Sequence, residues 1–179
     1  MHGNTPVWVD FRFVRDQPLQ YGMALPHRPR LYVIHNTHLP TQYYIGSTGN
    51  LHDRFQPRLA ACNEVGLTQN DLTHIHVYTI EIWCRLDGQG PEQPSQGPGN
   101  EGRVVWRSLL IDVEHILIRT FLQGFGCQLR NTGKTGPYQH VVAIQGPLCW
   151  QLHDQAGIGV LGGHAFHQRW YQLAEWETL

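Results

Sequence analysis

The chain has 179 residues, 41% of them hydrophobic, which is enough to bury the core of one domain. Thirteen Lys and Arg residues against fourteen Asp and Glu residues give a net charge of −1, whereas an autonomous DNA-binding protein usually has a clear positive balance. No apolar run approaches the ~20 residues of a membrane span, and the first residues do not resemble a signal peptide. We therefore expect one cytoplasmic domain without a membrane partner.

The first part of the chain predicts strands and a helix, with a proline-rich segment between the first strand and the next. Residues 6–14 alternate apolar and polar side chains and predict a half-buried strand. Three prolines make residues 16–30 an extended arm or loop. Residues 31–34 and 43–45 are short β-branched and aromatic runs that predict a hairpin, and helical spacing from Asn50 onward predicts a helix that carries Arg54.

The middle of the chain predicts a strand, a loop and a long helix. Residues 74–83 alternate strictly and predict a strand, while residues 86–102 are dominated by Gly, Pro, Gln and Ser and predict a flexible loop that is either disordered or a lid. Residues 104–125 repeat apolar side chains at helical spacing. Glu114 lies on this apolar helix, so its carboxylate needs a cation or strong hydrogen bonds, unless it pairs at the surface with Arg107 or Arg119.

The last part of the chain offers weaker signals. Residues 140–144 predict a strand, followed by a Gly-rich loop with surface histidines and a packing helix. The glycines near Lys134 do not form a P-loop, so no nucleotide cofactor is expected. The four cysteines lie far apart with no CxxC pair, which favours buried thiols over disulfides. A structural zinc remains an alternative with ligands of suitable type in Cys149, His153, His164 and His167.

The hairpin and the helix after it carry a family resemblance. LYV at residues 31–33, ten residues, YIG at residues 44–46 and then STGNLHDR resemble the core of the GIY-YIG endonucleases. Leu31 stands where that family has glycine, and Tyr32 keeps its tyrosine. The resemblance extends more thinly through Glu114 and Asn131. It implies an α/β fold of the α+β type, with a small central antiparallel sheet flanked by helices.

The resemblance also divides the chain. Residues 1–29 would form an N-terminal strand and arm, residues 30–136 the nuclease-like core with a flexible loop at 85–103, and residues 137–179 a C-terminal extension packed on the core. All three parts belong to a single domain.

The resemblance implies roles for four residues in phosphodiester hydrolysis. Tyr32 would take the proton from the attacking water, and Tyr44 would hydrogen-bond the phosphate or share that work. Arg54 would supply the positive charge that a tyrosine base needs and stabilise charge on the phosphate. Glu114 would hold one Mg²⁺ per active site, for which Mn²⁺ can substitute, because hard ions prefer carboxylate and water ligands.

Further residues are candidates for substrate contacts. Arg58 stands where the family often has histidine or tyrosine and would clamp a phosphate from the same helix face as Arg54. Asn131 stands near the family's asparagine, although asparagine is also a common turn former. Lys134 is a candidate phosphate contact, and His35 and His52 are candidate proton carriers. A basic group before the core would add phosphate contacts or be ordinary surface charge: Arg12, Arg15, Arg28 and Arg30.

The sequence thus predicts a metal-dependent DNA endonuclease. A compact restriction-type enzyme that recognises a DNA site is the first expectation, and it would act as a homodimer because cutting both strands with one site per chain requires two copies. A toxin-like or phage-borne nuclease of low sequence specificity is the alternative. A protein of another class remains open, namely a non-catalytic nucleic-acid-binding or partner-binding protein on the same fold.

Overall fold

The computed structural model describes residues 5–18, 30–36, 42–54, 75–97, 102–124, 128–131, 133, 148–154, 160–161, 164–165 and 171–172. The described strands are β1 (Val7–Pro18), β2 (Arg30–Asn36), β3 (Gln42–Thr48), β4 (Ile75–Leu86), β5 (Ser95–Gln96), β6 (Arg103–Trp106), β7 (Leu109–Asp112), β8 (Gln128–Leu129), β9 (Leu148–Asp154), β10 (Val160–Leu161), β11 (His164–Ala165) and β12 (Tyr171–Gln172). The described helices are α1 (Leu51–Arg54), α3 (Val113–Arg119) and the π-helix η3 (Thr120–Gly124). None of these helices combines the length and the apolar character needed to cross a membrane.

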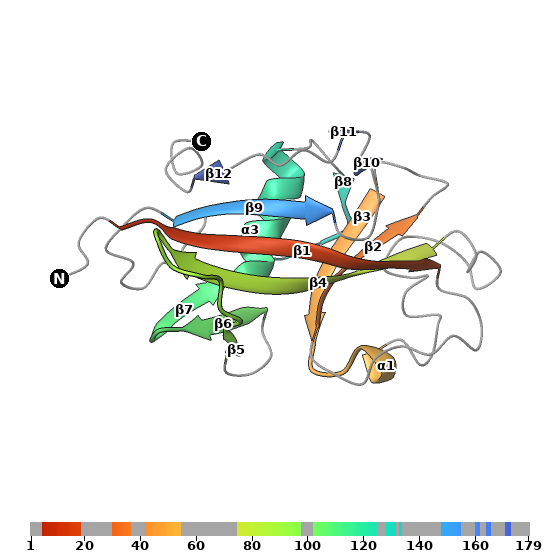
Figure 1. Ribbon diagram of the computed structural model, residues 1–179. Coiled ribbons are helices and arrows are strands. Elements are labelled where there is room, and N and C mark those ends of the chain that lie inside the picture. The colour runs from red at the N-terminus through yellow and green to blue at the C-terminus, as the bar shows by residue number, and fades with distance from the viewer. Residues whose placement is uncertain are drawn as a thin grey trace.

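The main sheet has seven strands in the order β12-β9-β1-β4-β2-β3-β8. Figure 1 shows β9, β1 and β4 as long neighbouring strands, with α3 lying across one face of the sheet. The fold is therefore a mixed structure of helix and sheet, as the sequence predicted at that coarse level. The predicted central antiparallel sheet is formed by β1, β4, β2 and β3. The described sheet as a whole is mixed, because β9 runs parallel to β1 and β8 runs parallel to β3. Both parallel partners return from distant parts of the chain, which is how a parallel pair must be connected.

The two longest strands follow from alternation in the sequence. Val7, Val9, Phe11 and Phe13 on β1 are at most 4% exposed and join the core beneath α3. β4 lies antiparallel to β1 with Phe11 opposite Ile82. The predictions of strands at residues 6–14 and 74–83 are confirmed, and each strand continues for a few residues further. These strands give the sheet one apolar face for α3 to cover.

The prediction of one long helix over residues 104–125 is wrong in its first half. Residues 103–112 form the hairpin of β6 and β7, and α3 begins only at Val113. The hairpin turns at Arg107 and Ser108, which both have positive φ, as a two-residue turn of this kind requires. The Asp112 side chain accepts a hydrogen bond of 2.9 Å from the His115 backbone N–H and so caps the helix. Apolar residues three and four apart resemble a helix even where β-branched residues favour a strand.

The prediction that residues 86–102 lack a packed element is also wrong. The Cys84 and Glu92 backbones exchange two hydrogen bonds of 2.8 Å, and β5 pairs with β6 to complete a three-stranded sheet. Glu92 also accepts hydrogen bonds of 2.8 Å from the Trp106 indole and the Arg107 guanidinium. These contacts bind the Gly- and Pro-rich segment to the β6–β7 hairpin. Residues 98–101 lie outside the described residues.

The C-terminal part of the chain supplies β9, a strand that the sequence did not predict. Trp150 on β9 is 1% exposed, and its indole donates a 2.9 Å hydrogen bond to the Thr120 hydroxyl on η3. On the other face of the sheet, Asp10 accepts a 3.1 Å hydrogen bond from Gln151 and lies 3.5 Å from the His153 ring. Strand β9 is thus fixed to the core through both faces. The strand predicted at residues 140–144 lies outside the described residues. The predicted final packing helix is wrong at residues 171–172, which form β12 and pair with β9.

Candidate functional site

The β2–β3 hairpin brings the two predicted tyrosines together. Tyr32 pairs with Gly46 and Ile34 pairs with Tyr44 in the antiparallel register. The tyrosine ring centroids are 6.4 Å apart at an interplanar angle of 30°. Tyr32 is 1% exposed, while Tyr44 is half-buried. A Cβ atom at position 46 would lie 2.5 Å from the Tyr32 hydroxyl, so the glycine of the YIG motif leaves the space that the Tyr32 phenol occupies.

Glu114 lies in the first turn of α3, next to the end of β3. Its carboxylate accepts a 2.6 Å hydrogen bond from the Ser47 hydroxyl, and its backbone N–H donates a 3.0 Å hydrogen bond to the Gly102 carbonyl. A short hydrogen bond to a carboxylate is a strong, charge-assisted one. The predicted need for a partner is thus met by Ser47, a residue that the sequence reasoning missed. Arg107, one of the alternative partners, forms its ion pair with Glu92 instead.

Gly102 is the second residue that the sequence reasoning missed. It has a φ of +73°, and a Cβ atom there would collide with the Glu114 carboxylate and Cβ. A glycine is therefore required for two reasons, the left-handed backbone and the close approach of Glu114. The only sequence signal for this position was a glycine at the end of the polar loop, twelve residues before the acidic residue that it contacts. The Glu114 side chain is held between Gly102 and Ser47.

The two halves of the candidate site meet at the end of β3, on opposite faces of that strand. Side chains alternate along a strand, so Tyr44 and Gly46 face away from α3 while Ser47 faces toward it and reaches Glu114. Tyr32 lies on the Tyr44 face because it pairs directly with Gly46. The tyrosine pair and the carboxylate are therefore separated by one strand end. A phosphate that contacts both groups would have to lie across the end of β3.

Arg54 is placed by the short helix that follows β3. The Asn50 side chain accepts a 3.3 Å hydrogen bond from the Asp53 N–H and donates one of 2.8 Å to the Asp53 carboxylate, a reciprocal cap at the start of α1. Arg54 ends α1 and is half-buried, and its N–H donates to the Asn50 carbonyl at 3.1 Å. His52 lies on the same turn, with its ring 3.1 Å from Asp53. The helix start predicted at Asn50 is confirmed, and it puts Arg54 at the Ser47 end of the hairpin.

His35 occupies the opposite end of the hairpin. Its ring stacks on Tyr43 with centroids 4.4 Å apart and planes within 8°, and its Nδ1 atom lies 3.4 Å from the Tyr78 hydroxyl. Tyr43 in turn packs edge-on against Phe121 beneath the sheet. Three strand positions separate His35 from Tyr32, about 10 Å along the strand. The structure packs the half-buried His35 against Tyr43 and Tyr78 and does not bring it to the end of β3.

Asn131 fixes the outer edge of β3. Its side-chain oxygen accepts a 2.9 Å hydrogen bond from the Ile45 N–H, and its side-chain nitrogen donates a 2.6 Å hydrogen bond to the Ile45 carbonyl. The Arg130 N–H donates to the Tyr43 carbonyl at 2.8 Å, which continues the pairing of β8 with β3. Asn131 therefore holds the strand that carries Tyr44. The candidate phosphate contacts Arg58 and Lys134 lie outside the described residues.

The predicted basic group before the core is described only at Arg12. Its guanidinium lies 4.6 Å from the centre of the Trp83 ring and 3.9 Å from Asp10. By register it shares the sheet face of Tyr32, two strands away. Arg15 and Arg30 lie on described strands, and nothing is described of their side chains. The pairing with Trp83 and Asp10 makes Arg12 part of the sheet surface.

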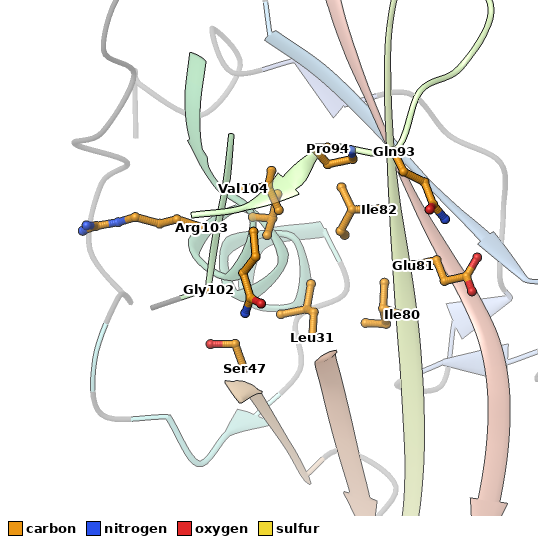
Figure 2. Close-up of a pocket in the computed structure, with 12 residues that line it drawn as sticks. Leu31, Ser47, Ile80, Glu81, Ile82, Gln93, Pro94, Gly102, Arg103 and Val104 are labelled. Carbon is orange, nitrogen blue, oxygen red and sulfur yellow. The ribbon is translucent and has the colours of Figure 1, made fainter. Parts of the chain in front are cut away.

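A cavity of about 270 Å³ adjoins the Glu114 side of the site. Figure 2 shows the side chains of Leu31, Ile80, Ile82 and Val104 gathered around it, with Gln93 and Pro94 at its edge. Ser47 and Gly102 also line this cavity, and both contact Glu114. The cavity lies between the main sheet and the small sheet, so it depends on the strand β5 that the sequence did not predict.

The described donors at Glu114 suit a hard divalent ion. Glu114 and Ser47 offer only oxygen atoms, and Mg²⁺ is often bound through one or two carboxylates together with waters and substrate phosphates. Within the described part of the chain, no three or more His, Cys, Asp or Glu side chains gather as a metal cage. The zinc alternative has no cluster there either. Among its four residues, His167 lies outside the described residues.

Comparisons with known proteins add no relative to this picture. No known protein family, no curated protein and no solved structure matches the chain. The resemblance to the GIY-YIG endonucleases therefore depends on the motif residues themselves, and the function must be argued from the chemistry of the side chains.

Proposed function

We propose that this chain is a metal-dependent DNA endonuclease that hydrolyses phosphodiester bonds. The observation that carries the proposal is the Ser47–Glu114 hydrogen bond of 2.6 Å at the end of the strand that also carries Tyr44 and Gly46. It supports a site in which a carboxylate, a hydroxyl and a tyrosine pair act around one phosphate. The GIY-YIG resemblance supplies the reaction type, and the site chemistry is compatible with it.

The two tyrosines take different parts in this proposal. Tyr44 is half-buried and Tyr32 is almost fully buried, so Tyr44 is the better candidate to meet the water and the phosphate. Tyr32, whose phenol packs over Gly46, orients Tyr44 and shares the proton. A tyrosine in water has a pKa near 10, so either phenol needs a cation nearby to act as a base at neutral pH. Arg54 is the candidate for that cation, and it also offsets charge on the phosphate.

Glu114 and Ser47 would hold the divalent ion. When bound, Mg²⁺ acts as a Lewis acid that stabilises charge on the phosphate oxygens. Gly102 fixes the backbone of Glu114 through the 3.0 Å hydrogen bond, while Ser47 fixes one carboxylate oxygen. The other carboxylate oxygen would then face the ion. The chain's own contribution is to hold this carboxylate in one orientation before substrate arrives.

The proposed setting is a cytoplasmic, restriction-type enzyme that acts on DNA as a homodimer. A toxin-like or phage-borne nuclease of low sequence specificity is the competing subclass, and the net charge of −1 suits weak non-specific binding. The pattern of fragments distinguishes the two, because discrete bands indicate a recognised site and a smear indicates low specificity. Non-catalytic binding of nucleic acid is the competing class.

The test is plasmid cleavage with Mg²⁺ by the full chain, by Glu114→Gln and by Glu92→Gln. Glu92 is a matched control because it is an exposed glutamate paired with Arg107, at the turn of the β6–β7 hairpin. We expect Glu114→Gln to lose at least about a hundredfold in rate, the scale of removing a group that stabilises transition-state charge. Glu92→Gln should cleave like the unmodified chain. Unchanged cleavage by Glu114→Gln would exclude the metal role, and binding without any cleavage would favour the non-catalytic class.

A further inference from the structure

The cavity beside Glu114 shares its wall with the proposed nuclease site. Ser47 lines the cavity and donates to the Glu114 carboxylate, and Gly102 lines it and accepts from the Glu114 N–H. Ser47 and Gly102 are therefore common to the cavity wall and to the contacts of Glu114. The cavity is part of the surface that a bound substrate would meet.

The floor of the cavity excludes the charged part of a nucleic acid. Leu31, Ile80 and Val104 line it and are 7%, 2% and 9% exposed, and Ile82 adds a further aliphatic side chain. An ionised phosphate would lose its hydration among these side chains, which is costly. The cation that lines the cavity, Arg103, already lies 3.6 Å from the buried Asp112 carboxylate, and Figure 2 shows its side chain directed away from the aliphatic floor. A flat, uncharged ring would instead remove apolar surface from water on both sides. The floor thus favours the base of a nucleotide over its phosphate.

The rim of the cavity offers hydrogen bonds of both kinds. Gln93 and Gln96 line it, and both are exposed to solvent. Each carboxamide carries a donor and an acceptor, and glutamine amides can bond two atoms on a base edge at once. Figure 2 shows Gln93 at the edge of the cavity, with its carboxamide on the side of Glu81. An apolar floor with an amide rim is the arrangement that binds an unstacked base.

The size of the cavity sets the size of its ligand. Its volume of about 270 Å³ is just below the ~300–1,000 Å³ of pockets for drug-sized ligands. A cavity of this size favours a ligand no larger than a single base. A base inside a continuous duplex cannot reach such a cavity without leaving the stack.

We infer that this cavity binds one unstacked nucleobase of the substrate strand, next to the phosphate held at Glu114. The inference rests on the proposed nuclease function and narrows its substrate to nucleic acid with an unpaired or extruded base beside the cleaved bond. Single strands, loops and locally opened duplexes meet this condition. A fully paired duplex meets it only after the base has been extruded, which costs free energy.

The test measures binding by the unmodified chain with Ca²⁺ in place of Mg²⁺, with the substrate checked to be intact, and measures cleavage by the same variants with Mg²⁺. The probes are a fluorescent single-stranded oligonucleotide and its blunt duplex, with 2-aminopurine placed at successive positions of the single strand. The cavity variant is Gln93→Ala with Gln96→Ala in the same background. Gln89→Ala is the matched control, because Gln89 is an exposed glutamine of the same segment that does not line the cavity. A second cavity variant, Val104→Phe, fills the floor, and thermal unfolding checks that it folds.

We expect the single strand to bind at least about tenfold more tightly than the duplex, and the paired glutamine variant to weaken it by about tenfold, the scale of one lost bidentate base contact. The Gln89→Ala control should stay within about twofold of its parent, as for an ordinary surface change. The fluorescence of 2-aminopurine should rise when it stands at one position of the strand. This rise should be absent in the Gln93→Ala, Gln96→Ala variant and in folded Val104→Phe.

Several results overturn the inference. They are equal binding of duplex and single strand, equal effects of the paired glutamine variant and Gln89→Ala, and absence of nucleic-acid binding. Cleavage that depends on Glu114 but is insensitive to the cavity variants would leave the proposed nuclease function intact and remove the cavity inference alone. Cavity-dependent binding without any cleavage would support the cavity as a base-binding site and remove the proposed nuclease function.

Discussion

Substitution of Gly46 by alanine tests the packing at the centre of the candidate site. The new Cβ would lie 2.5 Å from the Tyr32 hydroxyl, 2.7 Å from Tyr32 Cζ and 2.9 Å from Tyr44 Cε1. Each of these distances is shorter than van der Waals contact, and Tyr32 is 1% exposed, so its ring cannot move into solvent without disturbing neighbours. Inserting a methyl group into a packed core costs about 1–3 kcal/mol. Alanine recovers part of this, about 0.4–1 kcal/mol, by restricting the unfolded chain.

The expected net result is therefore a loss of up to about 2.6 kcal/mol in the free energy of unfolding, measured by urea denaturation. Gly90→Ala is the matched control, because nothing lies within 4 Å of a Cβ there and its backbone is not left-handed; its stability should be unchanged or slightly raised. Nicking activity of Gly46→Ala should also fall at temperatures where it remains folded, because the tyrosine pair is displaced. The reasoning is wrong if Gly46→Ala unfolds at the same urea concentration as Gly90→Ala.

Two further predictions concern the frame around the site. Asn131→Ala leaves the Ile45 N–H and carbonyl without their side-chain partners and should lower the free energy of unfolding by about 1–3 kcal/mol; a urea midpoint like that of the unmodified chain would contradict this. Burial acts to raise the pKa of Asp10, but hydrogen bonds from His153 and Gln151 and the charges of His153 and Arg85 outweigh it and hold that pKa below 3.8. Because the folded pKa is depressed, Asp10 stabilises the fold above about pH 4 and this contribution is lost as pH falls through the folded pKa. Urea unfolding of the unmodified chain and of Asp10→Asn, measured from neutral to acid pH, gives the difference between their free energies of unfolding. This difference should shrink as pH falls below about 4. A difference that grows toward acid pH would contradict the prediction.

The elements that the sequence predicted well are those with a local cause. β1, β4 and the β2–β3 hairpin follow from alternation of β-branched and aromatic residues, and α1 follows from the Asn50 cap. The β6–β7 hairpin was missed because the apolar spacing of its residues also fits a helix. The Asp112 cap marked the true start of α3, and a search for that cap would have shortened the predicted helix.

In the candidate site, too, the features that the sequence predicted have a local cause and the features that it missed do not. The approach of Tyr32 and Tyr44 follows from hairpin pairing, and the need of Glu114 for a partner follows from its apolar surroundings. The identity of that partner did not follow, because Ser47 and Glu114 are 67 residues apart and no local pattern connects them. The same limit applies to the cavity, which forms only where β5 and β6 approach the main sheet.

The pairing of β9 with β1 has a consequence for synthesis of the chain. Asp10 and Gln151, which meet across this pair, are 141 residues apart, so a ribosome adding 5–20 residues per second needs roughly 7 to 30 seconds to deliver the second strand after the first. During that interval the outer edge of β1 offers unpaired backbone groups flanked by Val9 and Phe11. Such an edge recruits other strands. The nascent chain therefore depends on rapid pairing of β9 with β1 once β9 has been made. Fragments that end before residue 148 would keep the exposed β1 edge and would tend to aggregate.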